Sequence, residues 1–189
     1  MGLRLPHLIK VAALALVCAG LVGGAENAAQ AARAQRQAPA QDAPLPKFKD
    51  FSVKTMFSGK PARPRLSGEF KRYFGHHYTA AAEEGVKFAG HYTLVTRTCG
   101  STCRIVDILD LKTGNTVKFD FASISGWREY HDAFEPVEAK PDSRLIVFAG
   151  ARNEKAPNGY HYYVLERGRL RFLRTVETGG DFMQPLSQE

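Results

Sequence analysis

The sequence predicts a mainly β domain of the α+β class, an antiparallel meander of about seven strands with one N-terminal helix packed against it. Three observations support this prediction. Short segments between residues 88 and 176 alternate apolar and polar residues, turn residues separate these segments, and residues 67–84 before them have helical periodicity instead. About 140 residues follow position 48, which is enough for a single domain with its own core.

The predicted helix begins after Ser67, which can act as an N-cap, and runs to about Glu84. Gly75 interrupts the pattern, and Gly85 offers a C-terminal stop. Four apolar residues share one face of this helix: Phe70, Phe74, Tyr78 and Ala81. Residues 48–65 before the helix contain glycine and proline and predict an irregular lead-in.

Strand signals begin at Phe88, where the residues alternate between two faces. One parity holds Phe88, Tyr92 and Leu94, and the other holds His91, Thr93 and Arg97. Residues 104–111 are apolar at both parities, as expected of a central strand covered on both faces. Residues 112–115 predict a hairpin turn, after which residues 116–121 alternate again.

The second half of the domain follows a loop around Gly126 and Trp127. Residues 141–143 predict a turn with proline at its second position, followed by a strand at residues 145–149. Residues 152–159 predict a polar loop. Residues 160–165 and 170–176 then close the domain as a hairpin around an Arg-Gly turn at positions 167 and 168.

The first 25 residues have the pattern of a cleavable secretory signal peptide. Two basic residues precede an uncharged apolar run, which is too short to cross a membrane core that needs about 20 residues. We expect cleavage near Ala25, with Ala31 as the alternative. Residues 26–47 then predict a disordered linker rich in Ala, Gln and Pro, and residues 48–189 form the β domain. The mature protein is therefore expected in the periplasm or outside the cell, without an integral membrane span.

The chain is basic, with a net charge of +7 at pH 7. Removal of the signal peptide leaves about +5, because it takes away two basic residues and no acid. In an exported protein this charge does not indicate nucleic acid as a partner. The possible partners are an envelope protein or an anionic envelope polymer, although a scattered solvated surface is the simpler explanation of the charge.

Two cysteines remain after processing, Cys99 and Cys103, and they predict a disulfide in an oxidising compartment. They fall between two predicted strands, so they can face each other where a three-residue hairpin loop closes. The loop residues between them are Gly100, Ser101 and Thr102. The bridge can act as a simple clamp, or it can stiffen these residues for presentation to a partner.

Residues 88–95, Phe-Ala-Gly-His-Tyr-Thr-Leu-Val, are followed by the Cys-Gly-Ser-Thr-Cys segment at 99–103 and by Asp-Leu-Lys-Thr-Gly at 110–114. These motifs resemble those of a family of small exported bacterial proteins to which no activity is assigned. The likeness covers roughly residues 65–175. It implies export and a disulfide-bearing domain, but it brings no catalytic residue with it.

Other candidate binding residues lie on the predicted strands. His91 and Arg97 share a strand face, while Arg169 and Arg171 continue a basic stripe from the last turn. Asp107 lies among apolar residues and needs a partner, which can be an arginine or His91, because an unpaired buried carboxylate is costly. It can serve either a structural ion pair or catalysis.

These features favour a non-catalytic binding or envelope-associated module that presents the disulfide loop. The alternative is a hydrolase or metal-dependent enzyme with a site around His91, Asp107 and His161. The sequence contains none of the common nucleophile, zinc or phosphate-loop motifs, and its histidines lack paired metal-ligand spacing. We therefore expect no cofactor and no bound metal.

Overall fold

The computed structural model describes residues 44–126 and 135–178. Within them the chain is mainly antiparallel β-sheet with one α-helix, which confirms the predicted fold class. The predicted signal peptide, residues 26–43 of the predicted linker, Trp127 and His131 lie outside these ranges.

The described chain forms a sheet of eight strands. They are β1 (Tyr92–Gly100), β2 (Cys103–Asp110), β3 (Thr116–Val117), β4 (Ser123–Ser125), β5 (Val137–Ala139), β6 (Leu145–Arg152), β7 (Lys155–Glu166) and β8 (Arg169–Glu177). The hydrogen-bonded order is β1-β2-β4-β6-β7-β8, while β3 also pairs with β2 and β5 with β6. Most neighbours in the sheet are therefore also neighbours in the sequence, as in a meander.

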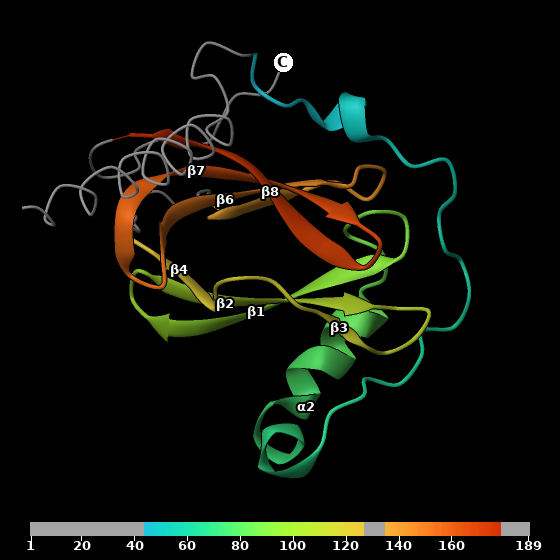
Figure 1. The fold of residues 1–189 in the computed structure, drawn as a ribbon. Coiled ribbons are helices and arrows are strands. Elements are labelled where there is room, and N and C mark those ends of the chain that lie inside the picture. Colours follow the sequence, from blue (N-terminus) through green and yellow to red (C-terminus); the bar gives the residue numbers. More distant parts are fainter. Residues whose placement is uncertain (1–43, 127–134, 179–189) are drawn as a thin grey trace, which may run out of the picture. The chain divides into compact units, whose positions relative to one another are not determined.

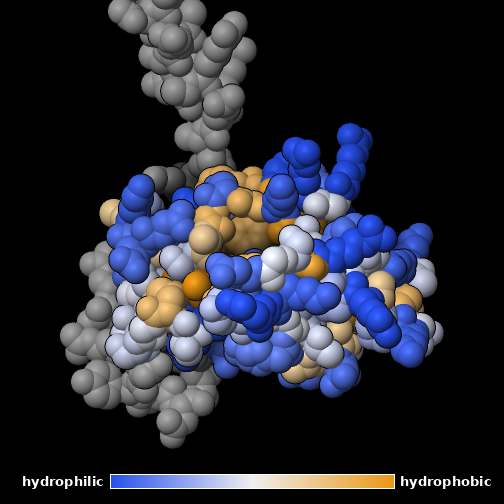
Figure 2. Space-filling model, turned by 90° about the horizontal axis from the view of Figure 1, so that it is seen from below, coloured by the Kyte–Doolittle hydropathy of each residue, from blue (hydrophilic) through white to orange (hydrophobic). Residues whose placement is uncertain are grey.

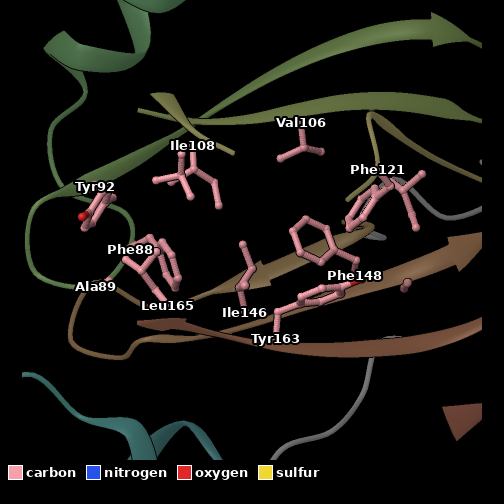
Figure 3. Packing of buried hydrophobic residues seen from close by; sticks show 13 residues of the cluster. Phe88, Ala89, Tyr92, Val106, Ile108, Phe121, Ile146, Phe148, Tyr163 and Leu165 are labelled. Carbon is pink, nitrogen blue, oxygen red and sulfur yellow. The ribbon is translucent and has the colours of Figure 1, made fainter. Parts of the chain in front are cut away.

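The largest hydrophobic cluster lies between two layers of this sheet. Strands β1 to β3 form one layer and β6 to β8 the other, and the short β4 joins them by pairing with both β2 and β6 (Figure 1). Val106 and Ile108 of β2 point toward Ile146, Phe148 and Tyr163 of the facing layer (Figure 3). Each fully buried side chain of this kind contributes about 1.5–3 kcal/mol, so this cluster holds the layers together.

The helix α2 (Gly68–Glu83) covers the outer face of β1 and β2 (Figure 1). Ser67 is its N-cap, as predicted, but its side chain makes no capping hydrogen bond. Gly75 does not interrupt the helix, and Gly85 follows it at φ +84°. The buried cluster beneath the helix comprises Tyr78, Ala81, Ala82, Val95, Leu109 and Leu111. Strand β2 is therefore covered on both faces, as its sequence predicts.

The short 3-10 helix η1 (Phe48–Phe51) packs on the outer face of the other layer. The hydroxyl of Ser143 donates a hydrogen bond to the carbonyl oxygen of Phe48 at 2.7 Å. The buried cluster here comprises Phe48, Leu145, Val147 and Tyr162. The chain then leaves η1 as an irregular segment that reaches α2, which agrees with the predicted lead-in.

Two predicted boundaries are wrong. Strand β1 begins at Tyr92 and not at Phe88, because Ala89 and Gly90 have positive φ angles of 47° and 81° and turn the chain tightly. Residues 152–159 are not a loop, since β6 and β7 continue to a two-residue turn at Asn153 and Glu154. These two residues have φ angles of 52° and 60°. A turn of two left-handed residues connects adjacent antiparallel strands without any further loop residues.

The short strands also differ from the prediction. Of the predicted strand at residues 116–121, only Thr116–Val117 forms a strand, β3, while Lys118 makes an isolated bridge to Arg169 of β8. Strands β4 and β5 were not predicted, because three residues are too few to produce a recognisable alternation.

Candidate functional site

A cavity of about 730 Å³ lies between α2 and the irregular segment that precedes it. Its interior is formed mainly by apolar side chains, of which Ala82 and Leu111 are buried and Phe57, Leu66 and Val86 are half-buried. We call this cavity the α2 pocket. It occupies the volume range of small-molecule sites, roughly 300–1,000 Å³.

Backbone hydrogen bonds hold the outer wall of the α2 pocket, residues 57–66, to the rest of the domain. The amide of Phe57 donates to the carbonyl of Gly90 at 2.7 Å, and the amide of Ala62 donates to that of Leu111 at 2.8 Å. The amide of Arg65 donates to the carbonyl of Gly114 at 2.7 Å. This irregular wall is thus attached at both ends and in the middle, so the pocket is preformed.

Glycine is required at position 114 for this attachment. Gly114 has a φ of +75°, and a Cβ atom there would lie 2.1 Å from the carbonyl oxygen of Arg63. No side chain can be accommodated at that distance. The turn after β2 therefore fixes how closely the wall approaches the sheet.

The helix side of the α2 pocket carries Lys71, Gly75 and Thr79 at intervals of four residues. This spacing places them in one row along the helix. A Cβ atom added at Gly75 would meet only the Lys71 side chain, at 3.6 Å. The hollow therefore exists partly because the middle residue of the row has no side chain.

The rim of the α2 pocket is predominantly basic. Its charged lining residues are Lys60, Arg63, Lys71 and Glu83, all exposed. Figure 2 views the molecule from below, the side of α2 in Figure 1, and shows hydrophobic surface in a hollow with hydrophilic residues around it. An apolar interior with a cationic rim can hold an apolar group while attracting a negative charge.

Asp107 has the partner that its sequence context requires, and the partner is an arginine. Its Oδ2 accepts a hydrogen bond from Arg97 at 3.0 Å and from the hydroxyl of Tyr78 at 2.6 Å. The guanidinium carbon of Arg97 lies 4.5 Å from the ring centroid of Phe74. Burial and the hydrogen bond to Asp107 raise the pKa of Tyr78 above its usual value. The interactions among Tyr78, Arg97 and Asp107 join α2 to β1 and β2.

His91 does not contact Asp107 through any described interaction. Its Nε2 lies 3.9 Å from an oxygen of Asp110, and its ring centroid lies 4.2 Å from that of Tyr92. Burial and the nearby Lys112 lower the pKa of His91, against the opposing effect of Asp110. It precedes β1 and is partly exposed.

His161 is fully buried, with an exposed fraction of 0%. Its Nε2 donates a hydrogen bond to the carbonyl of Gly150 at 2.7 Å, so its Nδ1 accepts one from the hydroxyl of Thr175 at 2.8 Å. Burial is the main reason that the pKa of His161 falls to about 4. The three residues of the alternative enzyme site, His91, Asp107 and His161, thus have separate sets of partners.

Cys99 and Cys103 lie at disulfide distance, with their Cα atoms 5.0 Å apart. The register differs from the expected one, since Gly100 pairs with Cys103 and Cys99 falls in a bulge. The turn therefore has two residues, Ser101 and Thr102, which are exposed together with Gly100. The base of this hairpin is closed, and its tip is accessible.

The basic stripe of the last hairpin is shorter than its sequence parity suggests. Arg167 lies in the turn at φ +50°, so Arg169 and Arg171 are the members of the stripe that belong to β8. Arg171 makes two hydrogen bonds to Glu166, at 2.8 and 3.0 Å. These arginines are on the last strand of the sheet order, and Arg97 and the disulfide hairpin belong to the first, so the sheet order does not bring them together.

Sequence reasoning did not identify the α2 pocket. The spacing of Gly75 and Thr79 was a usable signal, because small residues one helical turn apart leave a groove. The opposing wall gave no comparable signal, since residues 57–66 have no periodicity.

Residues 44–126 and 135–178 contain no group of three or more His, Cys, Asp or Glu side chains arranged to hold a metal ion. In the same ranges, no helix has the length and apolar character that a membrane crossing requires.

No protein-family model, curated protein or solved structure matches this chain.

Proposed function

We propose that this chain is an exported, non-catalytic binding protein whose ligand occupies the α2 pocket. The observation that carries the proposal is the pocket itself, a preformed cavity of about 730 Å³ with an apolar interior. Its wall is held by backbone hydrogen bonds at Phe57, Ala62 and Arg65, so little ordering is needed on binding. A preformed site binds more tightly because the entropy of ordering is already lost in the free protein.

Export is supported by the apolar run within residues 1–25 and by the cysteine pair at disulfide distance. Disulfides persist mainly in oxidising compartments, which include the periplasm and the exterior of the cell. N-terminal sequencing of the protein from its native host should show cleavage after Ala25 or Ala31. Recovery of intact Met1 would contradict the proposed location.

The non-catalytic assignment is supported by how the candidate catalytic groups are used. Asp107 is engaged by Arg97 and Tyr78, and both ring nitrogens of His161 are hydrogen-bonded inside the core. Such partners stabilise the domain. The rival proposal of a hydrolase or metal-dependent enzyme would be favoured by stoichiometric metal in the purified protein that is lost on replacing His91.

The pocket can be tested with an uncharged apolar fluorophore such as N-phenyl-1-naphthylamine. The mature protein should bind one fluorophore per chain in a saturable titration. Thr79→Phe places a large side chain in the pocket and should reduce affinity at least tenfold, whereas Ala80→Phe should leave it unchanged. Both positions are exposed on α2, but only Thr79 lines the cavity. Absence of saturable binding, or equal effects of the two variants, would overturn the proposal.

A second candidate surface is the tip of the disulfide hairpin, because residues 100–102 are exposed while their base is closed. Its partner would be an envelope protein or an anionic envelope polymer. Replacing Cys99 and Cys103 by serine should lower stability by only about 2 kcal/mol, since the ring is small. Capture of an envelope partner by the mature protein, weakened in this double variant more than its stability is, would support the hairpin. Equal capture by the two proteins would make the bridge a structural clamp.

A further inference from the structure

We propose that the ligand of the α2 pocket is a single-chain amphipathic anion, an acyl or alkyl chain with a carboxylate or similar acidic head group. This inference rests on the proposed function and specifies the chemical class of its ligand. Two properties of the pocket carry it, the apolar lining and the sign of the charge at the rim.

The lining offers apolar surface that the domain leaves uncovered. Phe57, Leu66 and Val86 pack against the cluster beneath α2 but remain only half-buried. Ala82 and Leu111, which are buried, complete the lining. An apolar chain would cover the partly exposed surfaces, which is favourable in proportion to the area removed from water.

Three cations surround this apolar interior from both walls. Lys60 and Arg63 belong to the irregular segment, and Lys71 lies on the facing side of α2. None of these three side chains has a hydrogen-bond or ion-pair partner among residues 44–126 and 135–178, whereas Arg72 and Arg171 are paired with glutamates. Unpaired cations on opposite walls favour an anion that lies between them.

The acidic lining residue, Glu83, does not neutralise Lys71. Glu83 lies three turns beyond Lys71 along α2, about 18 Å along the helix axis. That separation exceeds the screening length of about 8 Å at physiological salt. The charged lining residues therefore leave the rim with an excess of positive charge, three cations against one carboxylate. This excess favours an amphipathic ligand whose head group is an anion.

Titration calorimetry with matched ligands tests the head group. We expect dodecanoate, below its micelle concentration, to bind the mature protein at least tenfold more tightly than dodecan-1-ol. Dodecylamine should bind more weakly than either. Affinity should rise about fourfold for each methylene from octanoate to dodecanoate, as expected of a chain that enters an apolar cavity. Added salt should weaken binding of the carboxylate and leave binding of the alcohol unchanged.

Charge reversal tests the residues. The double variant Lys60→Glu/Lys71→Glu should lose at least tenfold in affinity for dodecanoate and keep its affinity for dodecan-1-ol. Lys118→Glu/Lys155→Glu makes the same change in net charge at exposed lysines outside the pocket and should bind dodecanoate as the parent does. Equal effects of the two double variants would overturn the assignment of the rim.

The outcomes separate this inference from the proposed function. Equal binding of all three head groups, or tightest binding of the amine, would overturn the anionic ligand but would leave a pocket that binds apolar molecules. If neither these ligands nor the uncharged fluorophore bound, the proposed function itself would be wrong.

Discussion

The two flanks of α2 have the same spacing of residues, but one is packed against the domain and the other lines a cavity. Phe70, Phe74 and Tyr78 form one row, and Lys71, Gly75 and Thr79 form the next, one position further along the chain. The aromatic rings of the first row pack against one another. The ring centroids of Phe70 and Phe74 lie 5.1 Å apart, and those of Phe70 and Tyr78 lie 5.8 Å apart. The second row faces the α2 pocket.

The difference lies in what faces each row. The aromatic row meets Arg97 and Asp107, which project from β1 and β2 and close the interface with an ion pair. The open row meets residues 57–66, which backbone hydrogen bonds hold to the rest of the domain and which leave a cavity beside the helix. One flank therefore stabilises the domain, and the other leaves room for a ligand.

The largest effect is expected on the filled flank. Tyr78→Ala removes a side chain that is 1% exposed and should lower the free energy of unfolding by about 4 kcal/mol, because it leaves a cavity. Urea unfolding measures this loss. Tyr73→Ala, at a helix position that is 56% exposed, should change it by less than about 0.5 kcal/mol. A loss below about 1 kcal/mol for Tyr78→Ala would show that this flank is not a structural interface.

The pH dependence of stability tests the core between the two layers of the sheet, where His161 is buried. The pKa of His161 falls from 6.5 in the unfolded chain to about 4 in the folded one, so between these values the unfolded state binds more protons. Stability should be constant with respect to this group above pH 6.5. It should then fall by about 1 kcal/mol per pH unit toward pH 4. Thermal unfolding across this range measures the loss, and His161→Gln should remove the dependence. An unchanged slope in that variant would assign the loss to other groups.

The ion pair on the filled flank should contribute less than the aromatic packing. Asp107→Ala leaves Arg97, whose side chain is 11% exposed, without its partner and should lower stability by about 2 kcal/mol. Asp120→Ala offers a matched control, because Asp120 also lies beside an arginine and a tyrosine but is 63% exposed. It should cost under about 1 kcal/mol. Chemical unfolding of both variants decides the comparison, and equal losses would contradict it.

The smallest effect is expected on the open flank, and its sign is reversed. Gly75→Ala should raise the free energy of unfolding by about 0.5–1 kcal/mol, because alanine favours the helix and the added methyl meets no atom closer than 3.6 Å. Binding of the uncharged fluorophore should persist in this variant. Destabilisation by Gly75→Ala would mean that the flank is closed in solution.

The sequence predicted the helix and most strands because their signals are local. Phe70, Phe74 and Tyr78 recur at helical spacing, and Gly85 follows as a stop at a positive φ. The turn at Asn153 and Glu154 was missed because its strand ends are polar and exposed, as a loop would be. Both residues adopt left-handed φ angles, which asparagine favours but which a glutamate beside it does not indicate from sequence.

The candidate site was less predictable than the fold. The need of Asp107 for a partner followed from its apolar neighbours, but the choice of Arg97 over His91 depends on strand register. The α2 pocket depends on hydrogen bonds from residues 57–66 to Gly90, Leu111 and Gly114, which are distant in sequence. No periodic pattern reports such contacts. Export and the family resemblance stay predictions.

The most direct test of a ligand pocket beside α2 is an NMR titration of the ¹⁵N-labelled mature protein with dodecanoate. We predict saturable amide shifts confined to residues 57–66, 71–86 and Leu111, with Gly75 and Thr79 among the most affected. The amides of Gly150 and Gly159, in the sheet away from the pocket lining, should remain unchanged. Shifts centred on residues 100–102, or the absence of any saturable shift, would contradict the account.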